Sequence, residues 1–231
     1  MALDYDQILG PELTFKGAVP PPKAPIDGKT VRLEPIEPAR HVADLYEVSK
    51  SDDTLWNYMG YGPFADQAAM KTWLDGCAAS SDPLFFAIID KATARTVGML
   101  SFMRIDAKGG AIEIGHIWFA PILKQTRQAT EAIFLTMRET FDRWGYRRLE
   151  WKCNSRNMPS RAAALRFGFT YEGLFRQHLI VRGRNRDTCW FSMLDGEWPE
   201  VKAAFERWLD PSNFDAAGKQ KKPLAARRPF T

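Results

Sequence analysis

The sequence contains no apolar run approaching the ~20 residues that a membrane-spanning helix needs. Its start, Met1–Asp6, is acidic and lacks the basic residues and the apolar stretch of a signal peptide. Only three cysteines occur, Cys77, Cys153 and Cys189, and no Cys-x-x-Cys pair is present, so neither a disulfide framework nor a cysteine-ligated zinc site is expected. We therefore expect a cytoplasmic protein with no bound metal and no membrane partner.

Several catalytic signatures are also missing. The chain has no Gly-x-Ser-x-Gly nucleophile elbow, no phosphate-binding Gly-x-x-x-x-Gly-Lys-Ser/Thr loop and no His-Glu-x-x-His zinc motif. These absences argue against a serine hydrolase, a P-loop nucleotidase and a zinc protease. The 45% hydrophobic fraction is ordinary for a globular protein, so a sizeable core is available.

Excess positive charge is confined to the C-terminal end. The whole chain has a net charge of +4, and five cations without an acid fall within residues 218–231: Lys219, Lys221, Lys222, Arg227 and Arg228. The rest of the chain is therefore nearly neutral, and nucleic acid is not an expected partner. We predict that residues 211–231 form a basic, disordered tail, with a solubilising role favoured over that of an RNA-binding arm.

Proline punctuates the N-terminal end and hydrophobic periodicity organises the rest. Five prolines before residue 26 predict an extended arm over residues 1–29, followed by one domain over residues 30–210. Strands are expected over residues 30–36, 84–90, 96–105, 111–119, 149–153, 169–181 and 189–194. Helices are expected over residues 38–49, 66–77, 129–144, 158–167 and 197–209.

The most informative stretch runs from Glu113 to Asn157. An apolar strand is followed by a turn at Ala120-Pro121, a polar segment, an amphipathic helix ending near Gly145, and a second apolar strand. This order is a βαβ unit, whose strands are expected to be parallel neighbours. The turn places free backbone N–H groups at a helix N-terminus, where an anion can bind.

Two blocks of residues in and after this stretch carry a resemblance. The first is Lys124-Gln125-Thr126-Arg127-Gln128-Ala129 followed by Thr130-Glu131-Ala132, and the second is Asn157-x-x-Ser160 followed by Gly168-Phe169 and Glu172-Gly173. Over residues 30–209 the chain resembles the Gcn5-related N-acetyltransferases (GNAT), in details their RimJ/RimL-type branch. The resemblance implies an α/β (α+β) fold with a mixed, splayed central sheet of about seven strands flanked by helices.

The resemblance also implies a coenzyme A site, with acetyl-CoA as cosubstrate and no metal. The residues it assigns to that cofactor are Ile117, Trp118, Phe119, Lys124, Gln125, Thr126, Arg127, Gln128, Ala129, Thr130, Asn157 and Ser160. Arg127 stands where the family has a glycine that lets a phosphate approach the backbone. A guanidinium there could instead contact a phosphate directly.

Candidates for the acceptor side and for catalysis follow from the same comparison. Ser160 is the candidate partner of the leaving thiolate. Some relatives place a glutamate base where this chain has Leu179, so His116 and His178 are candidate bases and a water-relayed base stays open. Alternation along a strand predicts that Glu113 and His116 face opposite sides of the sheet.

The aromatic loop over residues 51–64 is a candidate wall of the acceptor site. Trp56 and Tyr58 within it, together with Glu113, are assigned to substrate binding, although these aromatics could equally cover the core. Arg182, Arg184 and Arg186 form a basic turn. A solvated turn is favoured there over attraction of an acidic substrate or a nucleotide 3′-phosphate.

These residues together predict an acetyl-CoA-dependent N-acetyltransferase. It would move an acetyl group to a primary amine, in a small molecule, an amino acid or a protein N-terminus, by direct attack in a ternary complex. The alternatives are a non-catalytic acyl-CoA-binding or protein-interaction module on the same fold, and a ribosome- or RNA-associated modifier. A homodimer also stays open.

Overall fold

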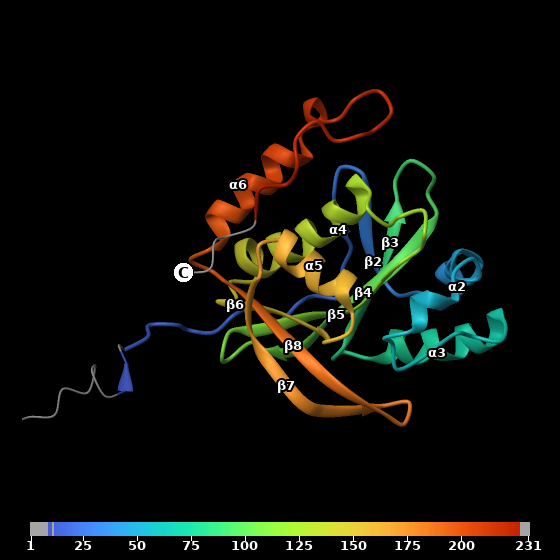
Figure 1. The fold of residues 1–231 in the computed structure, drawn as a ribbon, viewed down its shortest axis with the longest axis horizontal. Helices are drawn as coiled ribbons and strands as arrows, with labels where there is room; N and C mark the ends of the chain where they lie inside the picture. The colour runs from blue at the N-terminus through green and yellow to red at the C-terminus, as the bar shows by residue number, and fades with distance from the viewer. Residues whose placement is uncertain (1–8, 11, 227–231) are drawn as a thin grey trace, which may run out of the picture.

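The computed structural model of the chain describes residues 9–10 and 12–226 (Figure 1). One eight-stranded sheet has the order β1-β2-β3-β4-β5-β6-β8-β7, and only β5 and β6 pair in parallel. The strands are β1 (Ile26–Asp27), β2 (Val31–Pro35), β3 (Leu84–Asp90), β4 (Thr96–Asp106), β5 (Ala111–Phe119), β6 (Arg148–Asn154), β7 (Thr170–Val181) and β8 (Arg184–Leu194). The predicted mixed sheet is confirmed, with a short first strand added by the arm.

Five α-helices flank the sheet: α2 (Pro38–Ser49), α3 (Gln67–Ala79), α4 (Arg127–Arg138), α5 (Met158–Arg166) and α6 (Trp198–Leu209). The start of α3 shows how a local interaction fixes a helix end: the Asp66 side chain accepts a hydrogen bond from Ala69 N–H at 2.7 Å, close to the predicted start. The predicted βαβ unit is also present, as β5, α4 and β6. The helix over residues 129–144 ends differently, because α4 passes into a π turn over Glu139–Arg143.

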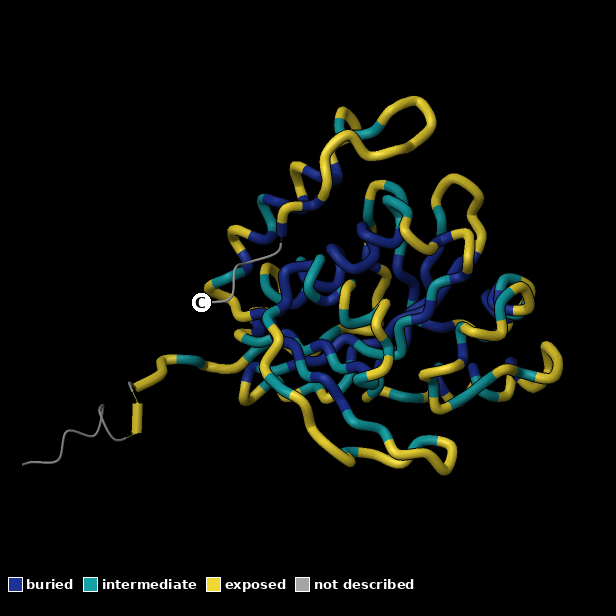
Figure 2. Tube along the Cα trace, viewed as in Figure 1, coloured by how far each residue is buried: buried dark blue, intermediate teal, exposed yellow. Residues whose placement is uncertain are grey.

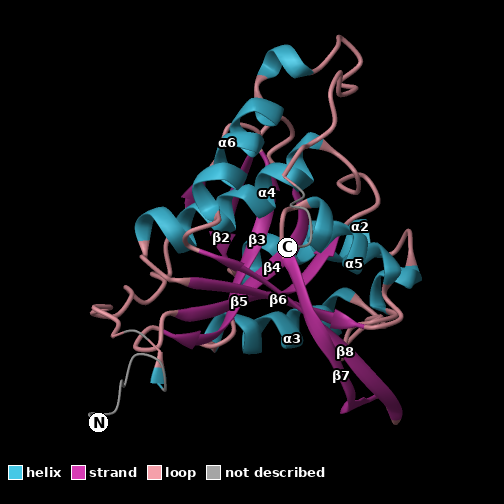
Figure 3. Cartoon of the chain, turned by 60° about the vertical axis from the view of Figure 1, so that its left-hand side comes forward, coloured by secondary structure: helices cyan, strands magenta, loops and turns pink. Residues whose placement is uncertain are grey.

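The two faces of the sheet bury two separate cores. On β3, Phe85, Ala87 and Ile89 pack with the apolar faces of α2 and α3, whereas the intervening Phe86 and Ile88 pack with α4 and α6. Figure 3 shows α3 beneath the sheet and α4 and α6 above it. Burial on both faces explains why β3 reads as a continuous apolar run.

The sheet opens between β5 and β6. Parallel pairing joins residues 111–114 to residues 148–151 and stops at Ile114 and Trp151, although β5 continues to Phe119. On its other edge, β5 stays paired with β4 through a bulge: three steps from Gly115 to Trp118 oppose two steps from Ser101 to Met99. His116 lies in the bulge with φ of +50°. The bulge bends β5 away from β6, which produces the predicted splay.

One side chain of the first motif anchors α4 to the sheet. The Glu131 carboxylate accepts hydrogen bonds from the backbone N–H groups of Lys29, Thr30 and Val31 at 2.6, 2.6 and 3.1 Å. Glu131 is buried, and the turn around Gly28 packs tightly against it. This glutamate is therefore a structural link between α4 and the start of β2.

Both extensions run along the domain. The arm hydrogen-bonds through Ala18 N–H to Ala107 O and through Val19 N–H to Trp144 O, each at 2.8 Å, while residues 1–8 and 11 lie outside the described residues. The predicted disorder of residues 211–231 is wrong as far as residue 226, because Phe214 bridges to Gln220 and Leu224 is buried. Arg227 and Arg228 lie outside the described residues.

The basic composition of this segment gave no indication of its packing against α6. Phe214 lies edge-on against Trp208 of α6, with ring centroids 5.1 Å apart. Figure 2 shows the alternation of buried and exposed residues along α6, whereas most of the loop that follows it is exposed. Within residues 9–10 and 12–226, no helix is long and apolar enough to span a bilayer.

Candidate functional site

An open cleft of about 1810 Å³ occupies the gap between β5 and β6. Its walls come from β5, β6, the starts of α4 and α5, the loop around residues 54–61, Trp208 near the end of α6, and residues 211 and 214–220 that follow α6. The C-terminal segment that the sequence predicts to be disordered is therefore part of the cleft wall. The cleft holds most of the predicted site residues, as the following paragraphs describe.

The exposed edge of β5 supplies backbone groups to the cleft. Beyond Ile114 this edge has no strand partner among the described residues, because β6 has turned away. Ile117, Trp118 and Phe119 all line the cleft there. An amide-containing chain laid along this edge can pair with it as an added strand would. The backbone groups of these three residues are therefore accessible for the cofactor contact that the sequence predicts.

The turn before α4 has the geometry of an anion site. Gln125 adopts a left-handed conformation with φ of +62°, and the Thr126 hydroxyl accepts from Ala129 N–H at 3.1 Å. The N–H groups of Arg127 and Gln128 in the first helical turn have no intrahelical acceptor by position. Ala129, which is predicted to contact the cofactor, does not line the cleft, and its backbone N–H is bonded to the Thr126 hydroxyl that caps the helix.

Lys124 is held across the mouth of the cleft. Its ammonium lies 2.7 Å from Asp52 Oδ2, in the loop before the 3₁₀ turn Asp53–Trp56. The hydrogen bond from Lys124, helped by one from Thr54, lowers the pKa of Asp52. The predicted basic residue of the motif is thus in the cleft but already paired with a carboxylate.

Arg127 reaches toward the C-terminal segment. Its Nη2 donates to the carbonyl of Leu209, and its guanidinium lies 4.8 Å from the centre of the Phe214 ring. Its Nε is buried and has no hydrogen-bond partner within the described part of the chain. The arginine that replaces the family glycine therefore fastens residues 209–214 beside the turn, and it leaves one donor that fits an anion bound there.

The second motif block forms a second wall at the start of α5. The Asn157 side chain accepts from Ser160 N–H at 3.2 Å, as a helix cap does. Ser160 Oγ lies 3.0 Å from Trp151 Nε1. Because an indole nitrogen only donates, Ser160 must be the acceptor, and its own O–H is left to donate, with the neighbouring Cys153 sulfur as one acceptor. Burial raises the pKa of the neighbouring Cys153 thiol to about 11, which keeps that thiol protonated.

His116 lies in the cleft beside the aromatic loop. Its Nδ1 is 3.3 Å from the Tyr61 hydroxyl, and the two rings are stacked with centroids 5.7 Å apart. Burial, and to a lesser degree the Arg104 charge, lower the pKa of His116. Burial also raises the pKa of Tyr61, which stays a neutral phenol. A neutral imidazole in the cleft at pH 7 is able to accept a proton.

The bulge corrects one prediction about the sides of β5. Simple alternation places Glu113 and His116 on opposite sides, yet both line the cleft. The extra residue of the bulge shifts the alternation by one position and turns His116 to the side of Glu113.

Two other predicted residues do not line the cleft. Trp56 is 1% exposed and packs in the core beside Trp118, so its predicted substrate contact is wrong. His178 is half-buried, with Nδ1 3.0 Å from Thr188 Oγ1, while its neighbour Leu179 lines the cleft. Tyr58 does line the cleft, and its hydroxyl donates to Arg156 O at 2.9 Å.

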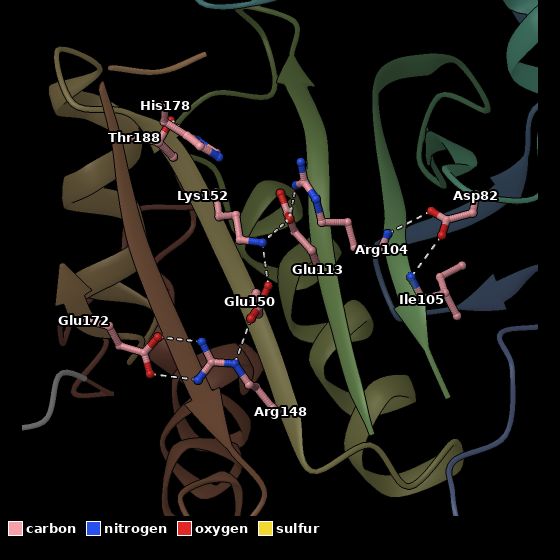
Figure 4. Close-up of polar contacts among 10 residues, drawn as sticks. All are labelled: Asp82, Arg104, Ile105, Glu113, Arg148, Glu150, Lys152, Glu172, His178 and Thr188. Carbon is pink, nitrogen blue, oxygen red and sulfur yellow. Dashed lines mark hydrogen bonds and ion pairs between the residues drawn. The ribbon is translucent and has the colours of Figure 1, made fainter. Parts of the chain in front are cut away.

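A charged network beneath the cleft was missed by sequence reasoning. Glu113 lies 2.9 Å from the Lys152 ammonium and 2.5 Å from Arg104, and Lys152 also contacts Glu150 at 2.6 Å (Figure 4). Arg148 continues the network to Glu150 and Glu172. Although burial opposes ionisation of Glu150, the bonds from Lys152 and Arg148 lower its pKa. The alternation of Arg148, Glu150 and Lys152 was the available signal.

A further contact joins the two loops at the mouth of the cleft. Arg182, in the turn between β7 and β8, donates through Nη2 to Tyr61 O at 2.7 Å and to Gly62 O. Two of the three arginines of the basic turn therefore contact other parts of the site: Arg186 lines the cleft, and Arg182 hydrogen-bonds to the aromatic loop. Arg184 is exposed.

Comparison with known proteins gives consistent matches. Residues 30–170 match the family model described as an acetyltransferase (GNAT) domain. A crystal structure of a GCN5-related N-acetyltransferase from Brucella melitensis is 47% identical, with a TM-score of 0.89 over 91% of this chain and 96% of that one. An uncharacterized N-acetyltransferase, p20, from Bacillus licheniformis is 28% identical over 64% of this chain and 84% of its own length.

A more distant structure shares the fold. It is the microcin C7 self-immunity acetyltransferase MccE, solved in complex with acetyl-CoA and AMP, at 23% identity and a TM-score of 0.65 over 72% of this chain and 93% of that one.

Proposed function

Because the chain belongs to the GNAT acetyltransferase family, whose members use acetyl-CoA, we propose that it acetylates a primary amine by direct attack within a ternary complex. The observation that carries the proposal is the splayed cleft, which brings the free edge of β5, the N-terminus of α4 and Ser160 together. The proposed catalytic unit spans residues 30–210. The RimJ/RimL-type motif blocks support assignment to that branch.

The residues present fit coenzyme A. The N–H groups of Arg127 and Gln128, with the orphaned Nε of Arg127, would hold the pyrophosphate. The unpaired edge of β5 over residues 117–119 would hold the pantetheine amides, and Asn157 would complete the site from α5. In the family, acetyl-CoA supplies the thioester that is attacked.

The chemical roles follow from which groups can accept or donate a proton. The amine nitrogen forms a bond to the acetyl carbon while the bond from that carbon to sulfur breaks. His116, neutral because burial lowers its pKa, accepts the proton that the amine loses, directly or through a water. Ser160, whose oxygen is engaged by Trp151, donates its O–H toward the departing sulfur. Neither role requires a residue outside the cleft.

The test combines binding with turnover. Calorimetric titration with acetyl-CoA is expected to show saturable binding, and release of free thiol is expected when a library of amines is added. Absence of binding at millimolar acetyl-CoA would contradict the proposal. Binding without thiol release from any amine would favour a non-catalytic acyl-CoA-binding protein on the same fold.

A further inference from the structure

The charged network beneath the acceptor side of the cleft is internally balanced. Its members are three cations and three anions: Arg104, Lys152, Arg148, Glu113, Glu150 and Glu172. Each cation contacts at least one carboxylate at 2.9 Å or less. Lys152, 4% exposed at its side chain, also lies 3.6 Å from the centre of the Trp190 ring. The network therefore has no charge left over for a ligand.

Arg186 is a cation of the cleft that stands outside this balance. It lines the same cleft from β8 and is half-buried. Within the described residues, no carboxylate lies within ion-pair distance of it, and its one hydrogen bond runs from Nε to Thr188 Oγ1 at 3.3 Å. Desolvation lowers the pKa of Arg186 without making it neutral. A half-buried guanidinium without a counter-ion is unfavourable unless a ligand supplies the anion.

The Arg186 side chain is held in place from behind. Thr188 is 1% exposed, and its oxygen receives the Nε–H of Arg186. The same oxygen lies 3.0 Å from His178 Nδ1, and because a hydroxyl has two lone pairs and one proton, it can bond both side chains with either tautomer of the imidazole. Engaging Nε in this way leaves the two terminal nitrogens of the guanidinium to form a paired contact with a carboxylate or phosphate. His178 is thus placed to support Arg186 rather than to reach the cleft.

The position of Arg186 corresponds to the acceptor side. Its charged neighbours are Glu113, on the closed part of the β5–β6 gap, and Arg104 of the adjoining β4, which pair with each other. Lys124 just before α4, Arg127 at its start and Arg166, which donates to Thr130 Oγ1 at 3.2 Å, line the cleft near the expected pyrophosphate. The two basic regions of the cleft therefore come from different elements, with the thioester expected between them.

From this geometry we propose that the acceptor amine carries an anionic group, a carboxylate or a phosphate, which Arg186 binds. The inference rests on the proposed N-acetyltransferase function and names its acceptor class. The balanced network beneath the site would fix the field around the bound anion, and Leu179 would pack against the body of the acceptor.

The experiment uses matched amines that differ by the anion alone. Tryptamine is compared with tryptophan, phenethylamine with phenylalanine, and ethanolamine with phosphoethanolamine, with thiol release followed at saturating acetyl-CoA. The anionic member of at least one pair is expected to have a roughly 10- to 100-fold higher kcat/KM, because a charge-assisted bond discriminates by about that factor. The pair that shows the preference identifies the anion as carboxylate or phosphate.

Variants assign the preference to the arginine. Arg186→Gln is expected to remove most of it through a raised KM, with kcat for the neutral amine nearly unchanged, and Arg186→Lys to keep part of it. Arg184→Gln, exposed on the same hairpin, is the matched control and is expected to keep the whole preference. Circular dichroism of each variant reports whether the overall secondary structure is retained.

Three results would count against the inference, in distinguishable ways. Thiol release with equal kcat/KM for both members of every pair would refute it and leave the proposed function intact. A preference that Arg186→Gln leaves unchanged would also refute it. If Arg186→Gln instead raised KM for acetyl-CoA but not for acetyl-dephospho-CoA, the arginine would bind the 3′-phosphate of the cosubstrate. Absence of thiol release with every amine would contradict the proposed function itself.

Discussion

Replacing Arg127 by alanine should loosen the segment after α6. The variant removes the bond from Nη2 to Leu209 O and the contact with the Phe214 ring. A hydrogen bond to a charged group contributes ~1.5–3 kcal/mol and an exposed cation–π contact ~0.5–1 kcal/mol. Part of this is regained by hydration, so we expect the local opening free energy of residues 210–222 to fall by about 2 kcal/mol.

The assay is amide hydrogen exchange in the absence of any cosubstrate. A loss of about 2 kcal/mol corresponds to roughly 30-fold faster exchange of amides protected within the segment. The Lys221 N–H, bonded to Asn213 O at 2.7 Å, and the Lys222 N–H, bonded to Asn213 Oδ1 at 3.0 Å, are suitable reporters. Arg207→Ala, an exposed arginine of α6, is the control and should leave both rates unchanged.

The result distinguishes two roles for Arg127. If exchange in the Arg127→Ala variant matches the parent protein while acetyl-CoA affinity drops, the fastening role is refuted and the side chain acts on the cosubstrate alone. Faster exchange together with weaker acetyl-CoA binding is the expected outcome, because residues 214–220 form part of the cleft wall.

Three other substitutions test the remaining assignments. Glu131→Gln should lower the melting temperature by roughly 5–10 °C, because an amide oxygen replaces a carboxylate that accepts three backbone N–H groups. It should leave KM for acetyl-CoA unchanged, and a changed KM with an unchanged melting temperature would contradict the structural role of Glu131. Ser160→Ala should lower kcat by roughly 100-fold with an unaltered calorimetric Kd for acetyl-CoA, and an unaffected kcat would reduce Ser160 to a partner of Trp151. Because burial lowers the pKa of His116 from its usual value near 6.5, kcat/KM corrected for the neutral fraction of the acceptor amine should decline only below that pH, as the imidazole becomes protonated. His116→Gln should abolish that acidic limb, and a limb that persists in the variant would point to another base.

Elements with strong local signals were predictable from the sequence. The helix over residues 66–77, the turn before the helix over residues 129–144 and the strand over residues 149–153 depend on a few neighbouring residues, and the structure places each within a few residues of its predicted position. The two motif blocks also predicted that the turn before α4 and the start of α5 would share one cleft.

Features that depend on distant contacts were not predictable. The bulge at His116 arises from the register between β4 and β5, and a positive φ at a histidine leaves no composition signal. The segment after α6 looked disordered because it is basic, yet Phe214 and Gln220 find partners on Trp208. Trp56 is a further example, since this residue of the aromatic loop packs in the core instead of lining the cleft.

The Arg182 bond across the mouth of the cleft has a consequence for how acceptor preference can evolve. The Arg182 side chain binds the carbonyls of Tyr61 and Gly62, which are 121 and 120 positions away in the sequence. The backbone position of the aromatic loop therefore determines how far the side chain from the β7–β8 turn must extend. Inheritance should therefore favour paired replacement of the two segments. A chimera that receives residues 57–64 from a relative should recover full activity only when it also receives residues 176–188 from the same donor.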